Sequence, residues 1–436
     1  MSDFPSSKFE RGKIIAKTGL KVGTNYAQRY IKKKVTGQEE SKKEFHKKNA
    51  KEVFTEFTKL KGTALKIAQG MSMDQGFLPE EFTEVMTQAQ YQVPPINKAL
   101  VRTILKKELG NYPESLFTSF TPDAIAAASI GQVHKATLKD GRVAAIKIQY
   151  PNVRETINSD LAISKTLAKQ FIKKGPRLDA YIDEIRSTLL LETDYIHEGT
   201  QIKSFHKRFN GSQIAIPEWI EEHSTEKVLA MSFLEGVHLD AFLARNPSQE
   251  EKNHYGQLIW EFFHEEIVEN DYVHADTHPG NFIFMDDGRL GVIDFGCTKK
   301  FPDEFFYNYL TLLPTHLARD EEAIRQLFSR LEIIDLEAED QSIENEYLEF
   351  ARNYGYMFAQ PYENDSFDFS NPEFHQRIKH FTQEAPLSNE LRGSKHFIYT
   401  SRTHVGLYTI LMKLGAVIDT RHSKDILNDI LDVSFT

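Results

Sequence analysis

Three polar residues, Asp276, Asn281 and Asp294, have the types and spacing of a phosphoryl-transfer site. Asp276 lies five positions before Asn281 in the string HADTHPGN, and Asp294 begins an Asp-Phe-Gly turn. A carboxylate in the first position can orient and deprotonate an attacking hydroxyl. The amide and the second carboxylate are hard oxygen donors, suited to magnesium ions that bridge the phosphates of ATP. The spacing therefore predicts Asp276 as the catalytic base, and Asn281 and Asp294 as metal ligands.

A β-hairpin signal lies between Asn281 and Asp294. Two apolar runs, residues 282–284 and 290–293, flank the turn sequence Asp286-Asp287-Gly288. Two short antiparallel strands in these positions would bring Asn281 and Asp294 together, although thirteen positions separate them. We therefore expect both metal ligands at one end of this hairpin.

The histidines of the same segment allow a second interpretation. The pattern His274-x-Asp276-x-His278 also fits a metal cluster, or a loop with an incidental pair of histidines. Within a phosphoryl-transfer site, we expect His274 to brace the loop, and a structural role is favoured for His278. Cys297 directly follows the Asp-Phe-Gly glycine and is expected to be a packed, small apolar residue.

The other half of a kinase-type site lies upstream. Ala144-Ala145-Ile146-Lys147 is typical of the strand whose lysine contacts the α- and β-phosphates in protein kinases. The string AAASIGQV, residues 126–133, keeps the last glycine and the valine of the loop pattern Gly-x-Gly-x-x-Gly-x-Val, but has alanine at its first two glycine positions. An apolar strand is expected over residues 228–233, before a hinge at residues 234–236. The residues expected to contact the nucleotide are Ala126, Ala127, Ala128, Ser129, Gly131, Val133, Lys147 and Met231.

Together with a segment further upstream, these motifs resemble the UbiB/AarF family of atypical protein-kinase-like proteins, over roughly residues 50–300. The upstream segment contains Lys66-Ile67-Ala68-Gln69, similar to the Lys-x-Gly-Gln motif of the family's N-terminal extension. Two positions depart from the family pattern, since Ala68 replaces a glycine and Thr277 stands where proline is usual. Neither change removes a charged group, although Ala68 bears on how closely its helix can approach a nucleotide.

The resemblance implies an α+β chain with a bilobal protein-kinase-like fold and a helical N-terminal extension packed on the kinase lobes. It also implies binding of ATP or ADP with Mg²⁺, and weak or absent phosphorylation of proteins. Lys66 and Gln69 are three positions apart and share one helix face, so both are candidates for contact with the nucleotide. Without the family pattern, a surface Lys and Gln on a bundle helix would be the ordinary explanation.

A glutamate partner is needed to hold Lys147 against the phosphates. The string Leu191-Glu192-Thr193-Asp194-Tyr195 resembles the family's Glu-x-Asp-Tyr motif, and we assign Glu192 as the catalytic partner of Lys147. On a single helix over residues 177–207, Glu198 would point away from Glu192 and could reach Lys66. The choice between Glu192 and Glu198 stays open at this point, and ordinary surface acids are the alternative to both.

The resemblance, together with periodicity, implies four parts. We expect a basic arm over residues 1–40, a helical extension with the Lys-x-x-Gln motif over 41–112, a kinase-like N-lobe with inserted helices over 113–233, and a mostly helical kinase-like C-lobe over 234–436. Helices are predicted over residues 97–109, 153–174 and 177–207, and a loop hairpin over residues 124–149.

Length and composition agree with a soluble, cytoplasmic enzyme. The 436 residues exceed one average domain, and the single cysteine excludes a disulfide framework. No apolar run approaches the ~20 residues of a membrane-spanning helix, and the first residues lack the apolar stretch of a signal peptide. Residues 1–50 hold 13 Lys/Arg and 5 Asp/Glu, a net charge of +8, which leaves −18 for the remainder of a chain whose total is −10. The basic arm suits peripheral contact with an anionic membrane or prenyl-lipid, or with an acidic face of the same chain, although a solvated tail is the favoured explanation. The acidic remainder disfavours nucleic acid as a partner.

Three functions are compatible with these motifs. The resemblance favours an atypical kinase or ATPase that supports isoprenoid-quinone or membrane-lipid metabolism. A small-molecule phosphotransferase similar to choline and aminoglycoside kinases is the second, because such enzymes carry a similar His-x-Asp-x-His-Pro-x-Asn loop. The alanine-rich loop and the Lys66–Gln69 motif argue against it. A nucleotide-sensing scaffold without turnover is the third.

Overall fold

A computed structural model describes residues 24, 96–128, 130–168, 177–268, 272–383 and 392–432 of the chain. The chain divides into two compact units. Unit 1 contains the chain up to Gly199 together with Trp219–Phe233 and Asn389–Leu391. Unit 2 contains Thr200–Glu218, Leu234–Ser388 and Arg392–Thr436. Of the predicted site residues, Lys66, Gln69 and Ser129 lie outside the described residues, as does the predicted extension up to residue 95.

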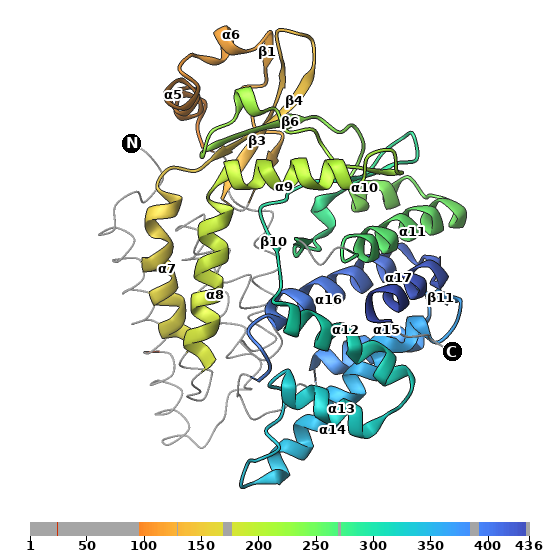
Figure 1. Ribbon diagram of the computed structural model, residues 1–436. Helices are drawn as coiled ribbons and strands as arrows, with labels where there is room; N and C mark the ends of the chain where they lie inside the picture. Colours follow the sequence, from red (N-terminus) through yellow and green to blue (C-terminus); the bar gives the residue numbers. More distant parts are fainter. Residues whose placement is uncertain are drawn as a thin grey trace, which may run out of the picture. The chain divides into compact units, whose positions relative to one another are not determined.

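Unit 1 is built on one mainly antiparallel sheet (Figure 1). Its strands follow the order β1-β3-β4-β6, and β2 also pairs with β3. The elements are α5 (Lys98–Leu109), α6 (Pro113–Leu116), β1 (Ser119–Phe120), β2 (Ala126–Ala127), β3 (Gly131–Thr137), β4 (Val143–Gln149), α7 (Val153–Ala168), α8 (Arg177–Glu192), the start of α9 (Tyr195–Arg208), the 3-10 helix η2 (Glu221–His223) and β6 (Val228–Ser232).

Local sequence signals explain several of these elements. The Asn97 side chain accepts a hydrogen bond from the N–H of Leu100 and caps α5, which ends at Gly110 with φ of +81°. This confirms the helix predicted over residues 97–109, since glycine adopts the left-handed conformation without a Cβ clash. The predicted hairpin is also present, as β3 and β4 pair over their whole length around a turn at Gly141, whose φ is +91°.

The prediction of one helix over residues 177–207 is wrong. The chain forms two helices, α8 and α9, with a break at Thr193 and Asp194. Asp194 Oδ1 accepts hydrogen bonds of 3.0 and 3.1 Å from the N–H groups of Ile196 and His197. A carboxylate that binds free N–H groups is a strong start signal for a new helix, so Asp194 begins α9 where the apolar periodicity alone suggested continuity.

Unit 2 is mostly helical, as predicted for the region after residue 240. Its described residues also form three small sheets, with strand pairings β5-β9-β8, β7-β10 and β11-β12. The two pairings β7-β10 and β11-β12 were not predicted, because strands of two or three residues leave no periodic signal. Its elements are the end of α9, β5 (Ile214–Ala215), α10 (Leu239–Ala244), α11 (Gln249–Glu265), β7 (Val273–His274), η3 (Pro279–Asn281), β8 (Phe282–Phe284), β9 (Leu290–Val292), β10 (Thr298–Lys299), α12 (Asp303–Leu317), α13 (Glu321–Arg330), α14 (Gln341–Ala359), η4 (Gln360–Tyr362), β11 (Ser366–Asp368), α15 (Pro372–Gln383), α16 (Phe397–Leu414), β12 (Val417–Asp419) and α17 (Arg421–Leu431).

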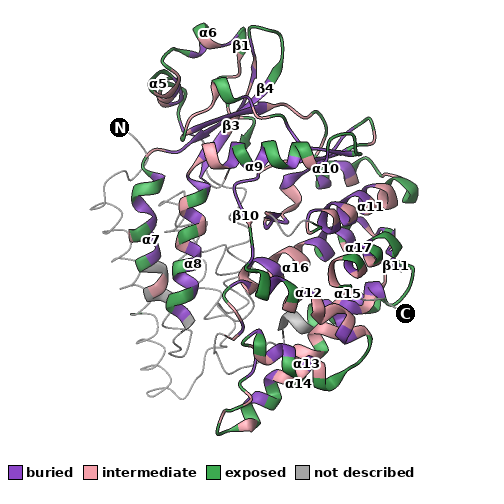
Figure 2. Cartoon of the chain, in the orientation of Figure 1, coloured by how far each residue is buried: buried purple, intermediate pink, exposed green. Residues whose placement is uncertain are grey.

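Helix α11 runs through the core of unit 2, and most of its length is coloured as buried or half-buried in Figure 2. Trp260 is fully buried, and its ring lies 5.1 Å from that of Tyr362 and 6.4 Å from that of Tyr408 on α16. Such aromatic contacts contribute beyond the area that they bury. At Gly256 the helix comes very close to the segment between α16 and β12. A Cβ at Gly256 would lie 2.4 Å from the Cβ of Ala416 in that segment.

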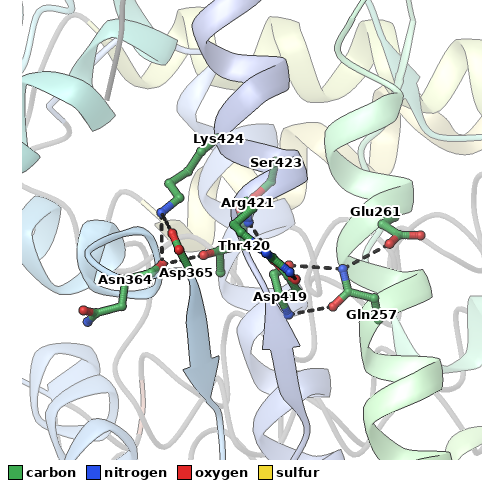
Figure 3. Close-up of polar contacts among 9 residues, drawn as sticks. All are labelled: Gln257, Glu261, Asn364, Asp365, Asp419, Thr420, Arg421, Ser423 and Lys424. Carbon is green, nitrogen blue, oxygen red and sulfur yellow. Dashed lines mark hydrogen bonds and ion pairs between the residues drawn. The ribbon is translucent and has the colours of Figure 1, made fainter. Parts of the chain in front are cut away.

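The pair β11-β12 is tied to α11 and α17 by side chains, as Figure 3 shows. Gln257 of α11 both donates to the carbonyl oxygen and accepts from the N–H of Asp419, at 3.1 and 2.8 Å. Lys424 of α17 bonds Asp365 at 2.8 Å, and the Thr420 hydroxyl donates to the carbonyl of Asn364. These bonds satisfy backbone groups at the edge of a very short sheet.

Among the described helices, none is both long and apolar enough to cross a membrane.

His264 makes the stability of unit 2 depend on pH. Its ring nitrogens lie 2.8 Å from the Tyr362 hydroxyl and 2.7 Å from the carbonyl oxygen of Trp260, and burial lowers its pKa from 6.5 to about 4. Below pH 6.5 the unfolded chain binds a proton that the folded chain does not, so the folded state loses up to roughly 3 kcal/mol from this group by pH 4.

We expect His264→Gln to flatten the fall in unfolding free energy between pH 7 and pH 4.5, measured by urea unfolding. His380→Gln, the same change at an exposed position of α15, should leave the wild-type pH dependence intact. Equal slopes for wild type and His264→Gln would contradict the assignment.

Candidate functional site

The candidate site residues fall into two groups, one in each unit. The lysine group, in unit 1, contains the alanine-rich loop, Lys147 and Met231. The loop group, in unit 2, contains Asp276, Asn281 and Asp294.

Sheet register places several predicted nucleotide contacts on one face of the sheet. Ala126 pairs with Val133, Val133 with Lys147, and Lys147 with Leu229. Directly paired residues of antiparallel strands point to the same face, and so do residues two apart on a strand. Met231 therefore shares this face with Lys147, Val133 and Ala126.

The first half of the alanine-rich loop is a short exposed strand, and the second half is closed by a backbone hydrogen bond. Ala126 and Ala127 form the exposed strand β2, and Ala127 pairs with Gln132, on the face opposite Lys147. The N–H of Ala128 donates to the carbonyl of Gly131 at 2.9 Å, which closes the loop. Gly131 is buried, and a Cβ there would lie 2.5 Å from the carbonyl oxygen of Ile148. Only glycine therefore fits at this position of the loop pattern.

Lys147 is held by a buried ion pair with Glu198. Its Nζ lies 2.8 and 3.0 Å from the two carboxylate oxygens of Glu198. Lys147 is 5% exposed and Glu198 is 1% exposed. The Nζ also lies 5.2 Å from the ring centroid of Tyr195, within cation–π distance. A bidentate, charge-assisted contact in a buried setting fixes the position of the ammonium group.

The assignment of Glu192 as the partner of Lys147 is therefore corrected to Glu198. Glu192 is buried in the last turn of α8, whereas Glu198 lies in the first turn of α9. The prediction assumed one continuous helix, on which the two glutamates would point in different directions. The Asp194 cap starts a separate helix, and Glu198 gains the stabilisation that an acid has in a first turn.

The loop group is assembled by the predicted hairpin. Strands β8 and β9 pair in antiparallel register, with Phe282 opposite Val292. The N–H of Ile293 then donates to the carbonyl of Asn281 at 2.9 Å, which brings Asn281 beside the residue that precedes Asp294. Asn281 Nδ2 donates to the carbonyl of Asp276 at 2.9 Å, so its Oδ1 is the atom that it can offer a metal.

Asp294 has an unusual backbone. Its φ is +65°, in the left-handed region that few residues other than glycine, Asn and Asp adopt. Its neighbour Phe295 is fully buried, with its ring 4.9 Å from that of Phe205 and 5.3 Å from that of His274. The buried phenyl ring anchors the turn, in which the Asp294 side chain is half-buried.

His274 and Glu266 support the loop through hydrogen bonds. His274 Nε2 lies 2.9 Å from the carbonyl oxygen of Asp294, and the backbone N–H of His274 donates to the Glu266 carboxyl at 2.8 Å. Burial lowers the pKa of His274 and raises that of Glu266 well above its usual value. His278 accepts a bond from the N–H of Gly280 through Nδ1. In the described part of the chain, no cluster of three His, Cys, Asp or Glu could hold a metal ion, so the metal-cluster interpretation has no support there.

Arg402 is a site residue that the sequence did not reveal. Its guanidinium donates to Asp276 Oδ1 from α16, and both side chains are mostly buried. Gly406, four positions along the helix, lets α16 approach the loop, since a Cβ there would lie 2.4 Å from the carbonyl oxygen of Thr277. Residues four apart share one helix face. The 126 positions between Asp276 and Arg402 leave no local signal for the pair.

Comparisons with known proteins show similarity to kinase-like proteins. Residues 88–328, more than half of the chain, match the family described as ABC1 atypical kinase-like domain. The chain is 27% identical over 442 residues to the probable serine/threonine-protein kinase abkA of Dictyostelium discoideum, covering 95% of this chain and 78% of that protein. It is 29% identical over 390 residues to the atypical kinase COQ8, mitochondrial, of Saccharomyces cerevisiae, covering 87% and 76%.

Other similarities are shorter or rest on structure. The protein ACTIVITY OF BC1 COMPLEX KINASE 8, chloroplastic, of Arabidopsis thaliana is 33% identical over 272 residues, which are 60% of this chain but only 36% of that protein. Among solved structures, the Rv3197–erythromycin complex from Mycobacterium tuberculosis aligns with a TM-score of 0.62 and 26% identity. The alignment covers 90% of this chain and 97% of that one.

A double-mutant cycle can test the corrected partner of Lys147. We expect Lys147→Met and Glu198→Gln to be coupled by about 2 kcal/mol or more in unfolding free energy, because either change alone leaves a buried charge without its counter-charge. The matched cycle of Lys147→Met with Glu192→Gln should give a coupling within about 0.5 kcal/mol of zero. A larger coupling for Glu192 than for Glu198 would restore the original assignment.

Proposed function

The chain belongs to the ABC1 family of atypical kinases, also called UbiB/AarF, and on that premise we propose that it is a magnesium-dependent ATP-binding kinase or ATPase. The observation that carries the proposal is the buried Lys147–Glu198 ion pair, since kinases require such a pair to hold the lysine against the nucleotide phosphates. The resemblance further supports a role in isoprenoid-quinone or membrane-lipid metabolism.

In this proposal the lysine group binds the nucleotide. Lys147 neutralises charge on the α- and β-phosphates, and Glu198 fixes its direction. Met231, Val133 and Ala126 share the face of Lys147 and contact the remainder of the nucleotide. The Cβ atoms of Ala126 and Ala128 restrict how closely the loop backbone approaches the phosphates. We therefore expect the γ-phosphate to be held differently from that of a protein kinase.

The loop group supplies the chemistry in this proposal. Asp276 orients and deprotonates the attacking hydroxyl or water, and Arg402 fixes the orientation of that carboxylate. Asn281 Oδ1 and the Asp294 carboxylate are hard oxygen donors that would hold Mg²⁺. Bound Mg²⁺ would neutralise the charge that develops on the phosphates. His274 and Glu266 hold the loop through hydrogen bonds.

Asp294→Asn tests the metal assignment. The change keeps the shape of the side chain and suits the left-handed backbone, but it removes the charge that binds Mg²⁺. We expect ATP affinity measured with Mg²⁺ to fall by about 100-fold, and the dependence of ATP binding on Mg²⁺ to weaken.

Asp287→Asn is the matched control, because it makes the same change on the exposed turn of the same hairpin, where Asp287 bonds only its neighbour Arg289 among the described residues. Equal ATP affinity in wild type and Asp294→Asn would remove Asp294 from the metal site.

Binding of ATP without hydrolysis by the wild-type protein would favour the scaffold function. Hydrolysis that anionic vesicles do not change, compared with zwitterionic ones, would oppose the membrane part of the proposal.

Arg402→Ala tests whether Arg402 positions Asp276. We expect ATP turnover to fall by about ten-fold, because a misdirected base loses catalytic effect, while affinity for Mg²⁺-ATP stays within about two-fold. Arg352→Ala, which breaks the distant Arg352–Glu321 ion pair in the same unit, should leave turnover unchanged. Turnover lost equally in both variants would point to general damage to unit 2.

A further inference from the structure

Helix α9 carries a glycine directly after Glu198, although glycine is unfavourable inside a helix. Gly199 is buried in α9, where alanine would be the more stabilising choice for the helix itself. The side chain of Trp219 explains the glycine. A Cβ at Gly199 would lie 2.2, 2.5 and 2.7 Å from Cε2, Nε1 and Cδ2 of the indole. Only glycine therefore lets the start of α9 approach this ring so closely.

The Trp219 indole is fixed against the sheet that carries Lys147. Its Nε1 donates to the Ser224 hydroxyl at 3.0 Å, and the same oxygen accepts from the N–H of Ala230 at 3.0 Å. The backbone of Trp219 forms a bridge with Met231 on β6, and β6 pairs with β4, the strand of Lys147. A clash with the indole should therefore displace the start of α9 rather than the ring.

Glu198 and Gly199 make two different contacts between α9 and this sheet. Successive residues of a helix project about 100° apart. The carboxylate of Glu198 reaches Lys147 Nζ at 2.8 and 3.0 Å, whereas Gly199 faces the Trp219 indole. All four residues belong to unit 1. The indole thus limits how near α9 can come to the sheet, and the ion pair needs the helix at that distance.

We propose that Trp219 and Gly199 are positioning residues for Lys147, because their contact sets the distance between α9 and the sheet at which Glu198 forms its ion pair. The inference rests on the proposed kinase function, and it names a further pair of residues on which the lysine depends. A lysine that binds phosphates must be held in one place, and a displacement on the order of 1 Å is enough to slow a reaction strongly.

Gly199→Ala tests the proposal in the full-length protein without nucleotide. In this background the coupling in unfolding free energy between Lys147→Met and Glu198→Gln should fall to about half of its wild-type value or less, because the added methyl group moves α9 away from the sheet. Gly256→Ala is the matched control in unit 2, since a Cβ there would also overlap a neighbour, the Cβ of Ala416 at 2.4 Å. The control should leave the coupling unchanged. Full coupling in Gly199→Ala would overturn the proposal.

A compensating change at Trp219 tests whether the indole is the cause. Trp219→Phe has a smaller ring, which leaves a gap beside Gly199 and should also weaken the coupling between Lys147 and Glu198. In the double variant the alanine methyl group takes the space that the phenyl ring leaves, so at least about half of the lost coupling should return. The two Trp219→Phe variants keep the test decisive if Gly199→Ala alone does not fold. Full coupling in Trp219→Phe would overturn the role of the indole, as would a double variant no better than either single change.

ATP turnover separates this positioning role from the kinase function itself. Gly199→Ala should slow turnover by about ten-fold in the wild-type background, but by less than about two-fold in Glu198→Gln, because its effect acts through Glu198. Equal losses in the two backgrounds would overturn the proposal. Lost coupling in Gly199→Ala, in a protein whose wild type shows no turnover, would support the positioning of Lys147 and contradict the kinase function.

Discussion

The proposed chemistry depends on one buried ion pair, that of Lys147 with Glu198. Such a pair is a poor source of stability, because removing two charges from water costs several kcal/mol and packed apolar residues are often as stable. Its presence in the interior of unit 1 is better explained by the need for a fixed positive charge. The sheet register, the Asp194 cap and the first turn of α9 all contribute to bringing these two side chains within 3.0 Å.

The loop group is supported in a different way. Burial lowers the pKa of His274 and raises that of Glu266, and so favours the uncharged form of each supporting group. Neutral groups can fix a loop by hydrogen bonds without adding to the charge around Asp276 and Asp294. Arg402 is the exception, and it acts directly on the proposed base.

The sequence predicted the parts of the fold that short-range patterns specify. The hairpin that brings Asn281 to Asp294, the paired strands around Lys147 and the helix ending at Gly110 all follow from turn residues and apolar periodicity. The family was also recognisable from the order of its motifs. The roles of the individual site residues remain predictions.

The errors arose where one residue changed the local geometry or where partners were distant. Apolar periodicity continues through residues 177–207, so the helix break at Asp194 was missed, and with it the role of Glu198. Periodicity records the face of a helix, whereas a cap depends on a single side chain. Arg402 could not be found from sequence, because only the packing of α16 at Gly406 brings it to Asp276.

The positive φ of Asp294 sets narrow limits on variation at this position. Its backbone conformation tolerates glycine, asparagine and aspartate, and strains most other residues. A magnesium ligand needs an oxygen donor, and a carboxylate serves best beside phosphate charge. Aspartate alone meets both demands fully. Glutamate, the usual conservative exchange, should therefore be tolerated less well here than asparagine as far as folding is concerned, and a saturation library sorted for stability would rank the two in that order.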